Sequence, residues 1–478
     1  MQTCWHSLKP EVALPASSWG WRRYWGSYRS AVEQALAADK RRARARFVRV
    51  STDRQSGPFG FEDEKIMPVD RRKGAVTPEK KLLAGISVWR GSSGTSMSVS
   101  KLVDSIRADV VVVGAGISGA FMAHALAGRY ERVVVVDRRV PIHGSTSVST
   151  AMLQFEIDQP LTKLGEKIGV RRATRAWRHS YRATQALVSL VHREGIRCGL
   201  ERRHALYVAG EDMGARGLER ESKARNRAGI PGEYLARPAL NSKFGINRSG
   251  AILSSNSAIA NPVQLAAGLL RRAAARGVRI YSPVNIEGVM ATAHGVTLDT
   301  GQHFIEAKYV IFCTGYEVLK CLPKQGTKIT STWAVASQPH SSYPAWLDQT
   351  LLWEASTPYL YLRTTPDGRV IAGGEDEDVD SASYRSRSIE RKSHRLAAKV
   401  KALIPGLSLN PTHKWTGAFG ESLDGLPLID AVPDMAGCFA VMGFGGNGTI
   451  YSVIAAQIVP RLMQGRTDGD ANLYRFRD

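Results

Sequence analysis

The sequence predicts an α/β protein, in which a Rossmann-like domain is interrupted by an inserted domain built on an antiparallel sheet. Three observations support this prediction. A glycine-rich turn joins a strand to a helix within residues 108–138, and a second glycine-rich helix start follows within residues 438–458. Between them, residues 328–374 form a series of short alternating strands separated by turn residues.

The first glycine-rich turn lies in ADVVVVGAGISGAFMAHALAGRYERVVVVDR. The continuous β-branched run before the turn suits a parallel strand that is buried on both faces. In the GxGxxG pattern that follows, Gly114 permits the tight turn, Gly116 lets a pyrophosphate approach the backbone, and Gly119 lets the helix pack closely on the sheet. The helix begins at Ile117 and Ser118, where unpaired N–H groups attract an anion.

A second β-branched strand follows the helix and ends at Asp137 and Arg138, roughly 20 residues beyond the glycines. An acidic residue at this place hydrogen-bonds the ribose of an adenosine. The order strand, turn, helix, strand and acid therefore predicts a dinucleotide-binding unit. The alternative is an ordinary βαβ unit whose glycines serve only helix packing.

Further helices are expected between the two glycine-rich turns. Apolar residues recur with helical spacing from Leu161 to Glu194, and a charged, exposed helix is expected from Asp212 to Arg227. Asn261 and Pro262 form a helix start, because asparagine caps the first turn and proline fits the first helical position. Helices therefore alternate with strands, as the predicted α/β class requires.

The length and net charge of the chain limit the range of functions to consider. A chain of 478 residues predicts two domains with appendages, and a net charge of +22 raises the possibility of nucleic-acid binding. The charge is not gathered in one place, however, because residues 1–96 hold 18 lysines and arginines against 9 acidic residues and the rest is spread along the body. A solvated basic surface is therefore favoured, and no nucleic-acid partner is expected.

No metal site, disulfide framework or membrane span is expected. The five cysteines show no CxxC spacing, which also indicates a reducing compartment. The most apolar window, residues 110–126, coincides with the glycine-rich strand and helix, so its hydropathy needs no lipid. The N-terminus lacks a basic segment followed by an apolar one, so no secretory signal is predicted and a cytoplasmic location is expected.

Residues 1–96 are poor in apolar periodicity and mix tryptophans with an arginine cluster. Such a segment buries too little surface to order itself, so it is predicted to be a disordered, basic extension that the folded protein does not need. Met97 would then be the natural start of the folded chain. The alternative is a basic arm that contacts a partner.

Two further stretches carry a more specific pattern. A loop of small residues follows Asp137, reading HGSTSVSTAMLQ, and the chain closes with WTG, DGLPLI and GFGGNGT. These motifs, over roughly residues 108–465, resemble those of the FAD-dependent family of D-amino-acid, glycine and sarcosine oxidases (the DAO family). The resemblance implies FAD as the cofactor. Sarcosine-type members tether their flavin through a cysteine before the DGxPxI motif, and residues 415–423 contain none, so non-covalent FAD is expected.

The resemblance also implies which residues contact FAD. Small residues let the loop backbone lie flat beside the isoalloxazine, and the second glycine turn aims a helix N-terminus at the end of the flavin where negative charge collects. The candidates in the loop are Ser145, Ser149, Thr150, Ala151 and Leu153. The candidates elsewhere are Val284 beside the adenine, Thr314 and Gly315 at a strand end, and Gly417, Gly443, Gly446, Asn447, Gly448 and Thr449 in the closing motifs.

The expected domains alternate along the chain. The predicted FAD-binding domain comprises residues 106–200, 261–318 and 411–478, and the predicted substrate domain comprises residues 201–260 and 319–410. In some relatives an arginine before the turn of the substrate sheet binds the substrate carboxylate, which makes Arg363 the candidate here. Tyr359 and Tyr361 share its strand face and complete the candidate catalytic group. The alternative is that Arg363 is a solvated residue at a strand end.

The expected function is an FAD-dependent oxidoreductase that oxidises a small amine or amino acid by hydride transfer to flavin N5. The electron acceptor is oxygen or another carrier, and Ile371, where related oxidases place a lysine, tilts the expectation toward a dehydrogenase. Two alternatives stay open: an FAD-linked dehydrogenase of a hydroxyl substrate, and a basic nucleic-acid-binding flavoprotein.

Overall fold

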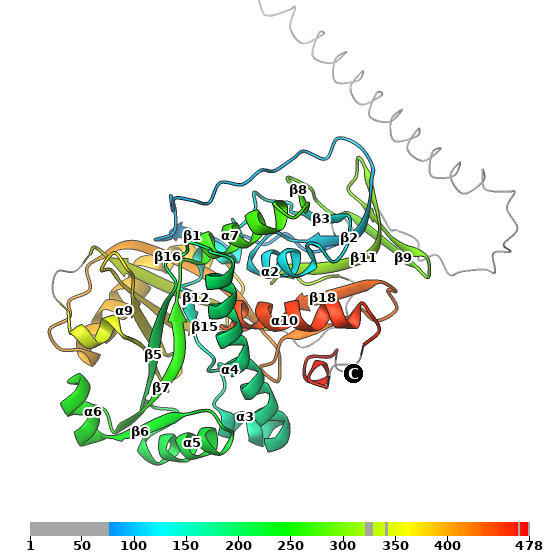
Figure 1. Ribbon diagram of the computed structural model, residues 1–478. Coiled ribbons are helices and arrows are strands. Elements are labelled where there is room, and N and C mark those ends of the chain that lie inside the picture. Colours follow the sequence, from blue (N-terminus) through cyan, green and yellow to red (C-terminus); the bar gives the residue numbers. More distant parts are fainter. Residues whose placement is uncertain (1–75, 321–327, 340–342, 467–468, 477–478) are drawn as a thin grey trace, which may run out of the picture. The chain divides into compact units, whose positions relative to one another are not determined.

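Two β-sheets organise the computed structural model, which describes residues 76–320, 328–339, 343–466 and 469–476 (Figure 1). All of these residues belong to one unit, Ile66–Asp478. The eight-stranded sheet has the order β17-β18-β11-β2-β3-β8, and β10 and β9 extend it beyond β11. Its strands are β2 (Ile106–Val113), β3 (Val133–Val136), β8 (Arg279–Tyr281), β9 (Gly288–Thr292), β10 (Gly295–Asp299), β11 (Phe304–Gly315), β17 (Leu428–Ala431) and β18 (Cys438–Met442).

The central strands of this sheet, from β18 to β8, are parallel and lie in a Rossmann-like arrangement. Three helices lie side by side on one face of the sheet, α7 (Pro262–Ala274), α2 (Ile117–Leu126) and α10 (Gly448–Leu462), as Figure 1 shows. A fourth, α4 (Val170–Arg193), packs on α10 and on β7 (Gly250–Ile259) of the other sheet. A Cβ atom at Gly119 would overlap the carbonyl oxygen of Gly114, so Gly119 is what allows α2 to lie this close to the turn.

The ten-stranded sheet has the order β1-β16-β12-β15-β14-β13-β5-β7-β4, with β6 paired to β7. The pairs are antiparallel as predicted, except that β13 and β5 run parallel. The strands are β1 (Leu83–Ile86), β4 (Met152–Leu153), β5 (Glu201–Val208), β6 (Gly232–Ala236), β7 (Gly250–Ile259), β12 (Lys328–Ser337), β13 (Thr350–Glu354), β14 (Leu360–Thr364), β15 (Val370–Glu377) and β16 (Pro411–Glu421).

Helices cover the ten-stranded sheet on the face that holds a second apolar core. α9 (Ile389–Leu403) packs there on β12, β15 and β16, after the short α8 (Ala382–Arg387). The remaining elements are α3 (Leu161–Ile168), α5 (Ala215–Arg227), α6 (Arg237–Phe244) and the 3₁₀ turns η2 (Ser145–Val148), η3 (Ala345–Asp348) and η4 (Ala471–Leu473). The single helix expected from Leu161 to Glu194 is broken between α3 and α4 at Gly169, whose φ is +87°.

The structure corrects the predicted N-terminal extension. Residues 83–86 form strand β1, which pairs with β16, and Trp89 is 8% exposed within the main core. Arg385 Nη2 donates to the carbonyl of Lys81 (2.6 Å), so the outer helices also hold this segment. Residues 76–96 therefore belong to the folded body, and Met97 is not its start. The rest of the predicted extension, residues 1–75, lies outside the described residues.

A second domain boundary also differs from the predicted one. Residues 411–421 were expected in the last part of the FAD-binding domain, yet they form β16 of the ten-stranded sheet, in register with β12. The tryptophan of this segment contacts the small-residue loop, and the motif does not mark a return to the FAD-binding domain. The eight-stranded sheet resumes at β17.

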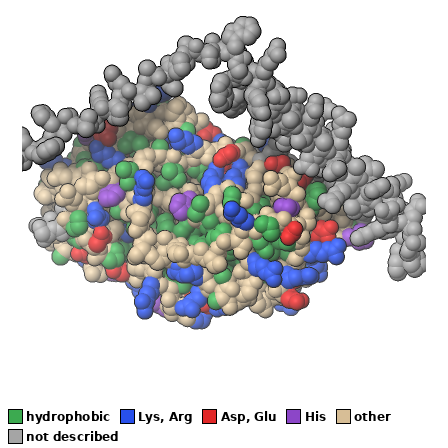
Figure 2. Space-filling model, turned by 90° about the horizontal axis from the view of Figure 1, so that it is seen from above, with side chains coloured by type: hydrophobic (Ala, Val, Ile, Leu, Met, Phe, Trp, Pro, Cys, Tyr) green, Lys and Arg blue, Asp and Glu red, His purple; other side chains and the backbone are tan. Residues whose placement is uncertain are grey.

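Neither the charge nor the hydropathy of the described residues indicates a further functional site. Figure 2 shows Lys and Arg side chains at several separate places on the displayed face, interspersed with acidic and apolar ones. Among the described residues no helix has the length and apolar character needed to cross a bilayer. The same residues contain no cluster of three or more His, Cys, Asp or Glu side chains arranged for a metal ion.

Candidate active site

A cavity of about 720 Å³ is lined by residues of both sheets, including the two glycine-rich turns. Its size falls within the range of ligand pockets, roughly 300–1,000 Å³. All predicted cofactor residues line it except Gly119, which packs α2 on the sheet, and Leu153, which is buried in the core. The parts of the chain that were expected to contact FAD are thus brought together.

The turn after β2 lines the cavity. Gly114 has a φ of +106°, and a Cβ atom there would collide with the carbonyl of Cys313. Helix α2 has no side-chain cap and no acidic residue in its first turn, and Gly116 faces the cavity. Ile117 N donates to Thr146 Oγ1 (2.9 Å), which leaves the rest of the helix start open to an anion. This geometry fits a pyrophosphate.

Asp137 lies beside this turn at the end of β3. Its Oδ2 accepts from Ala115 N (2.6 Å) and its Oδ1 from Arg139 N (2.8 Å), so its carboxylate holds the turn as well as lining the cavity. Burial raises its pKa, although these N–H donors oppose the shift. Val284 N donates to the Asp137 carbonyl (2.7 Å), which places the predicted adenine-side residue next to the predicted ribose-side one.

The small-residue loop is clamped from behind by three side chains. Trp415 Nε1 donates to the carbonyl of Val148 (2.9 Å), and Trp89 Nε1 donates to that of Ser149 (2.6 Å). Arg363 Nε donates to the next carbonyl, that of Thr150 (2.7 Å). Three consecutive carbonyls are therefore fixed by donors from β16, the N-terminal segment and β14. The loop backbone is held against the cavity before any cofactor binds.

Arg363 therefore does not have the predicted role. It is 1% exposed and does not line the cavity, and it also donates to the carbonyls of Ala260 and Thr364 (both 3.0 Å). Its guanidinium lies 5.3 Å from the centre of the Trp89 ring, and burial lowers its pKa to about 9. Arg363 does share a strand face with Tyr359 and Tyr361, which line the cavity, but it lies further along β14, beneath the loop.

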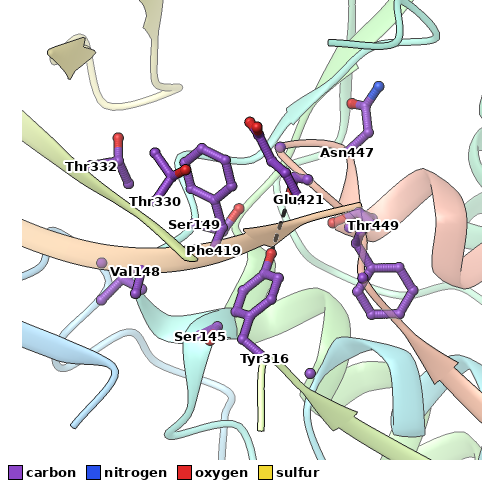
Figure 3. A pocket seen from close by; sticks show the side chains of 18 of the residues that line it. Ser145, Val148, Ser149, Tyr316, Thr330, Thr332, Phe419, Glu421, Asn447 and Thr449 are labelled. Carbon is purple, nitrogen blue, oxygen red and sulfur yellow. Dashed lines mark hydrogen bonds between the residues drawn. The ribbon is translucent and has the colours of Figure 1, made fainter. Parts of the chain in front are cut away.

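The second glycine turn also lines the cavity and starts α10, which again has no side-chain cap and no acid in its first turn. Gly446 N donates to Asp158 Oδ2 (2.7 Å), and Tyr316 OH donates to the carbonyl of Gly445 (3.1 Å; Figure 3). The amide of Asn447 donates to the carbonyl of Glu156, so this side chain ties the turn to the segment that carries Asp158.

The floor of the cavity is one face of the ten-stranded sheet. Alternate residues of a strand share a face, and six such side chains from three neighbouring strands line the cavity. They are Thr330 and Thr332 of β12, Asp376 of β15 with Asp378 just beyond it, and Phe419 and Glu421 of β16. Figure 3 shows Thr330, Thr332, Phe419 and Glu421 on the same side of the sheet.

Two carboxyl groups of the cavity, like the neighbouring Glu421, have raised pKa values. Asp158 is exposed to the cavity, and desolvation by the protein packed around it raises its pKa to about 7, despite the hydrogen bond from Gly446 N. Burial likewise raises the pKa of Asp376 to about 6, against the opposing effects of the Thr332 and Tyr359 hydroxyls. Both residues escaped the sequence analysis, because neither stands in a motif. The available signal was position: Asp158 follows the flavin-side loop, and Asp376 follows the paired glycines of β15.

A buried ion-pair network positions the segment that carries Asp158. Glu221 Oε1 and Oε2 accept from the backbone N–H groups of Leu161 and Thr162 (both 2.8 Å), which caps α3. Arg225 Nε donates to Glu221 (2.8 Å), and its Nη1 lies 3.7 Å from Glu156. Glu156 and Glu221 thus fix both ends of the segment, and Asp158 lies between them.

The features described so far fit FAD. α2 and α10 both begin at one cavity without a side-chain cap and without an acidic residue in their own first turn, and glycines before both helices leave the space that a side chain would fill. Asp137 and Val284 lie next to each other, and the clamped loop and the start of α10 line the same cavity. An elongated dinucleotide with a phosphate near α2 and an aromatic ring system near the loop and α10 would contact all of these groups.

Comparisons with known proteins agree. The family described as FAD dependent oxidoreductase (DAO) matches residues 109–462. Gamma-glutamylputrescine oxidoreductase of Escherichia coli is 24% identical, over 82% of this chain and 92% of its own. Glycine oxidase of Geobacillus kaustophilus is 23% identical, over 75% of this chain and 93% of its own.

Solved structures show the same fold. The crystal structure of glycine oxidase from Geobacillus kaustophilus aligns with a TM-score of 0.62 at 21% identity, covering 78% of this chain and 98% of that one. L-Proline dehydrogenase from P. horikoshii aligns with a TM-score of 0.64 at 16% identity, covering 78% and 97%. With its family motifs gathered around one cavity, the chain belongs to the DAO family of FAD-dependent oxidoreductases.

Proposed function

We propose that this protein oxidises the carbon–nitrogen bond of a small amine or amino acid. The relatives it matches carry names such as glycine oxidase and gamma-glutamylputrescine oxidoreductase, which describe amine and amino-acid substrates. The observation that carries the proposal for this chain is the position of Asp158. A carboxyl group with a pKa of about 7 lies beside the turn that starts α10, where the flavin ring is expected.

Bound FAD would supply the acceptor for the two electrons and the hydrogen that leave the substrate carbon. The protein must first handle a proton, because an aliphatic amine reaches the site as an ammonium ion and only the neutral amine can be oxidised to an imine. Asp158 is suited to take that proton on Oδ1, since Oδ2 already accepts from Gly446 N. Hydrolysis of the imine by water then gives a carbonyl compound and ammonia or an amine.

Other residues of the cavity are suited to exclude water and to stabilise charge during the reaction. Tyr359 and Tyr361 remain candidates for the wall that excludes water, and the start of α10 offers unpaired N–H groups to negative charge that develops during the reaction. Ile371 is fully buried and does not line the cavity, so its identity carries no information about the electron acceptor. Oxygen and a separate electron carrier both remain candidates.

The two alternative functions lack a supporting observation. A phosphorylated hydroxyl substrate needs arginines at the substrate end. Among the described residues, the arginines that line the cavity are Arg138 and Arg139, and both adjoin Asp137. Arg139 is already paired with Glu317 (2.6 Å). The dispersed lysines and arginines in Figure 2 likewise do not favour nucleic-acid binding.

A turnover assay tests the proposal. FAD-loaded protein is incubated with an artificial electron acceptor and with a panel of primary amines, secondary amines, amino acids and matching hydroxy compounds. We expect a carbonyl product and released nitrogen compound from at least one amine or amino acid and none from the hydroxy compounds. Oxidation of a hydroxy compound alone would refute the proposal.

A further inference from the structure

The floor of the cavity is strongly acidic. Asp158, Asp376, Asp378 and Glu421 all line it, and the carboxyl groups of Asp158, Asp376 and Glu421 interact electrostatically with one another. Asp378 is paired with Lys328, but one oxygen of Asp376, Oδ1, is buried without a hydrogen-bond partner in the described structure. A buried carboxylate oxygen without a partner is unfavourable unless a ligand supplies a donor.

The cavity offers little to a carboxylate. Arg363, the residue predicted to bind one, is buried outside the cavity and bonded to three carbonyls. Of the described lysines that line the cavity, Lys328 is paired with Asp378, and Lys163 lies exposed on α3. A substrate carboxylate on the sheet floor would therefore meet like charges without a guanidinium to offset them.

A row of aromatic rings stands beside the acidic floor. Tyr207, Trp353 and Tyr361 occupy neighbouring strands in register, β5, β13 and β14, and all three line the cavity. Tyr207 and Trp353 stack with their ring centres 3.8 Å apart. Gly373 of β15 leaves room for the Tyr361 ring, because a Cβ atom there would overlap it. Aromatic faces attract cations, and ammonium groups in particular.

Trp353 gives an independent sign that a ligand completes this wall. Its side chain is 8% exposed and its Nε1 has no hydrogen-bond partner in the described structure. A single neutral N–H group suits a water molecule or a neutral oxygen, and it does not offset the acidic floor. The aromatic row and the carboxylates together are suited to a chain that carries ammonium groups.

We propose that the substrate is an aliphatic diamine or polyamine that lacks a carboxylate. One nitrogen is oxidised, and the second, which stays an ammonium ion, binds to Asp376 on the sheet floor with the aromatic row along the alkyl chain. This inference rests on the proposed amine oxidation and narrows its substrate class. It departs from the amino-acid substrate that an arginine clamp at position 363 would have implied.

Three compounds isolate the two charges at issue. 1,4-Diaminobutane carries the second ammonium and no carboxylate, butylamine lacks the second ammonium, and ornithine is the diamine with an added carboxylate. Anaerobic reduction of the FAD-loaded full chain is measured with each, beside glycine and sarcosine. We expect the second-order rate constant for the diamine to exceed those for butylamine and ornithine by about tenfold or more.

Asp376→Asn tests the assigned residue, since asparagine keeps the shape and removes the charge. It should lower the ratio of the rate constant for the diamine to that for butylamine about tenfold or more, and retain FAD; the ratio is the readout because the charge of Asp376 also acts on Asp158, which serves both substrates. Asp434→Asn is the matched control, because Asp434 is exposed outside the cavity and asparagine tolerates its φ of +57°.

The outcomes separate this inference from the proposed function. Faster reduction by ornithine, glycine or sarcosine than by the diamine would overturn the inference and leave amine oxidation standing. Equal rates with diamine and butylamine, or an Asp376→Asn variant that retains the preference, would overturn it too. If none of the amines or amino acids reduces the flavin, the proposed function fails and the inference falls with it.

Discussion

Arg363 Nε donates a hydrogen bond to the carbonyl oxygen of Thr150 at 2.7 Å, across 213 residues of chain. The donor lies on the ten-stranded sheet and the acceptor lies on the loop beside the expected flavin. Together with Trp89 and Trp415, this arginine fixes three consecutive carbonyls of that loop. Preorganisation of the cofactor site therefore depends on side chains that do not themselves line the substrate space.

Replacing Arg363 should chiefly lower stability. Arg363→Ala leaves the carbonyls of Thr150, Ala260 and Thr364 without their donor, and each buried unpaired carbonyl costs about 1–3 kcal/mol. Arg363→Lys keeps the charge but not the fork, so we expect a smaller loss. Thermal and urea denaturation measure both. Per FAD-bound molecule, the rate of reduction by substrate should change little, and a selective loss of substrate binding at unchanged stability would restore the carboxylate role.

Two truncations test the boundary of the folded body. Deletion of residues 1–96 removes β1 and the Trp89 donor to Ser149, so we expect a lower melting temperature and weakened FAD binding. Deletion of residues 1–75 spares both and should have a much smaller effect. Differential scanning fluorimetry compares the melting temperatures of the two truncated proteins. The ratio of absorbance at 450 nm to that at 280 nm, roughly the flavin content per chain, compares their FAD binding. Indistinguishable behaviour of the two truncated proteins would contradict this boundary.

The glycines of the first turn should separate binding from folding. A Cβ atom at Gly116 meets only Thr146 Oγ1, at 3.2 Å, so Gly116→Val should fold and fail to bind FAD because its side chain occupies the pyrophosphate position. Gly119→Val should fail to fold, since its side chain overlaps the Gly114 carbonyl. Circular dichroism and flavin content distinguish the two. A Gly116→Val protein that retains stoichiometric FAD would count against the assigned cofactor position.

The pH dependence of flavin reduction should report Asp158. Its raised pKa of about 7 means that the carboxyl is protonated below that pH and ionised above it. Only the ionised form accepts the ammonium proton, so the rate constant should rise with pH and level off above about 7. Asp158→Asn should remove this limb and slow reduction by about 10²–10⁴-fold. Rapid-mixing kinetics from pH 5 to 9 measure this pH dependence. An unchanged rise with pH in the variant would exclude Asp158 as the group that accepts the proton.

The elements that carry local signals were predictable from the sequence. The run of valines before Gly114 and the four valines before Asp137 form β2 and β3, and α2 begins at Ile117 as expected. Asn261 does cap α7, accepting from Val263 N and Gln264 N (both 3.1 Å). These patterns are local, since the strand, turn and cap are all specified within a few residues.

What the sequence did not reveal depends on contacts between distant segments. The side chain of Arg363 lies on the predicted face of its strand. That face is covered by the loop at Thr150 and by Ala260, which are distant in the sequence. Strand β1 has only four residues and joins the fold through pairing with β16, so it left no periodic signal. The raised pKa of Asp158 likewise arises from packing around the cavity and not from its sequence neighbours.

Anaerobic mixing of the purified, FAD-loaded protein with amines and amino acids tests the central claim most directly. Transfer of two electrons from the substrate bleaches the absorbance of oxidised flavin, and no electron acceptor complicates the reading. The account predicts that at least one amine bleaches the flavin completely, with 1,4-diaminobutane faster than ornithine. A protein that binds FAD stoichiometrically, yet keeps its oxidised spectrum with every amine and amino acid while a hydroxy compound reduces it, would contradict the account.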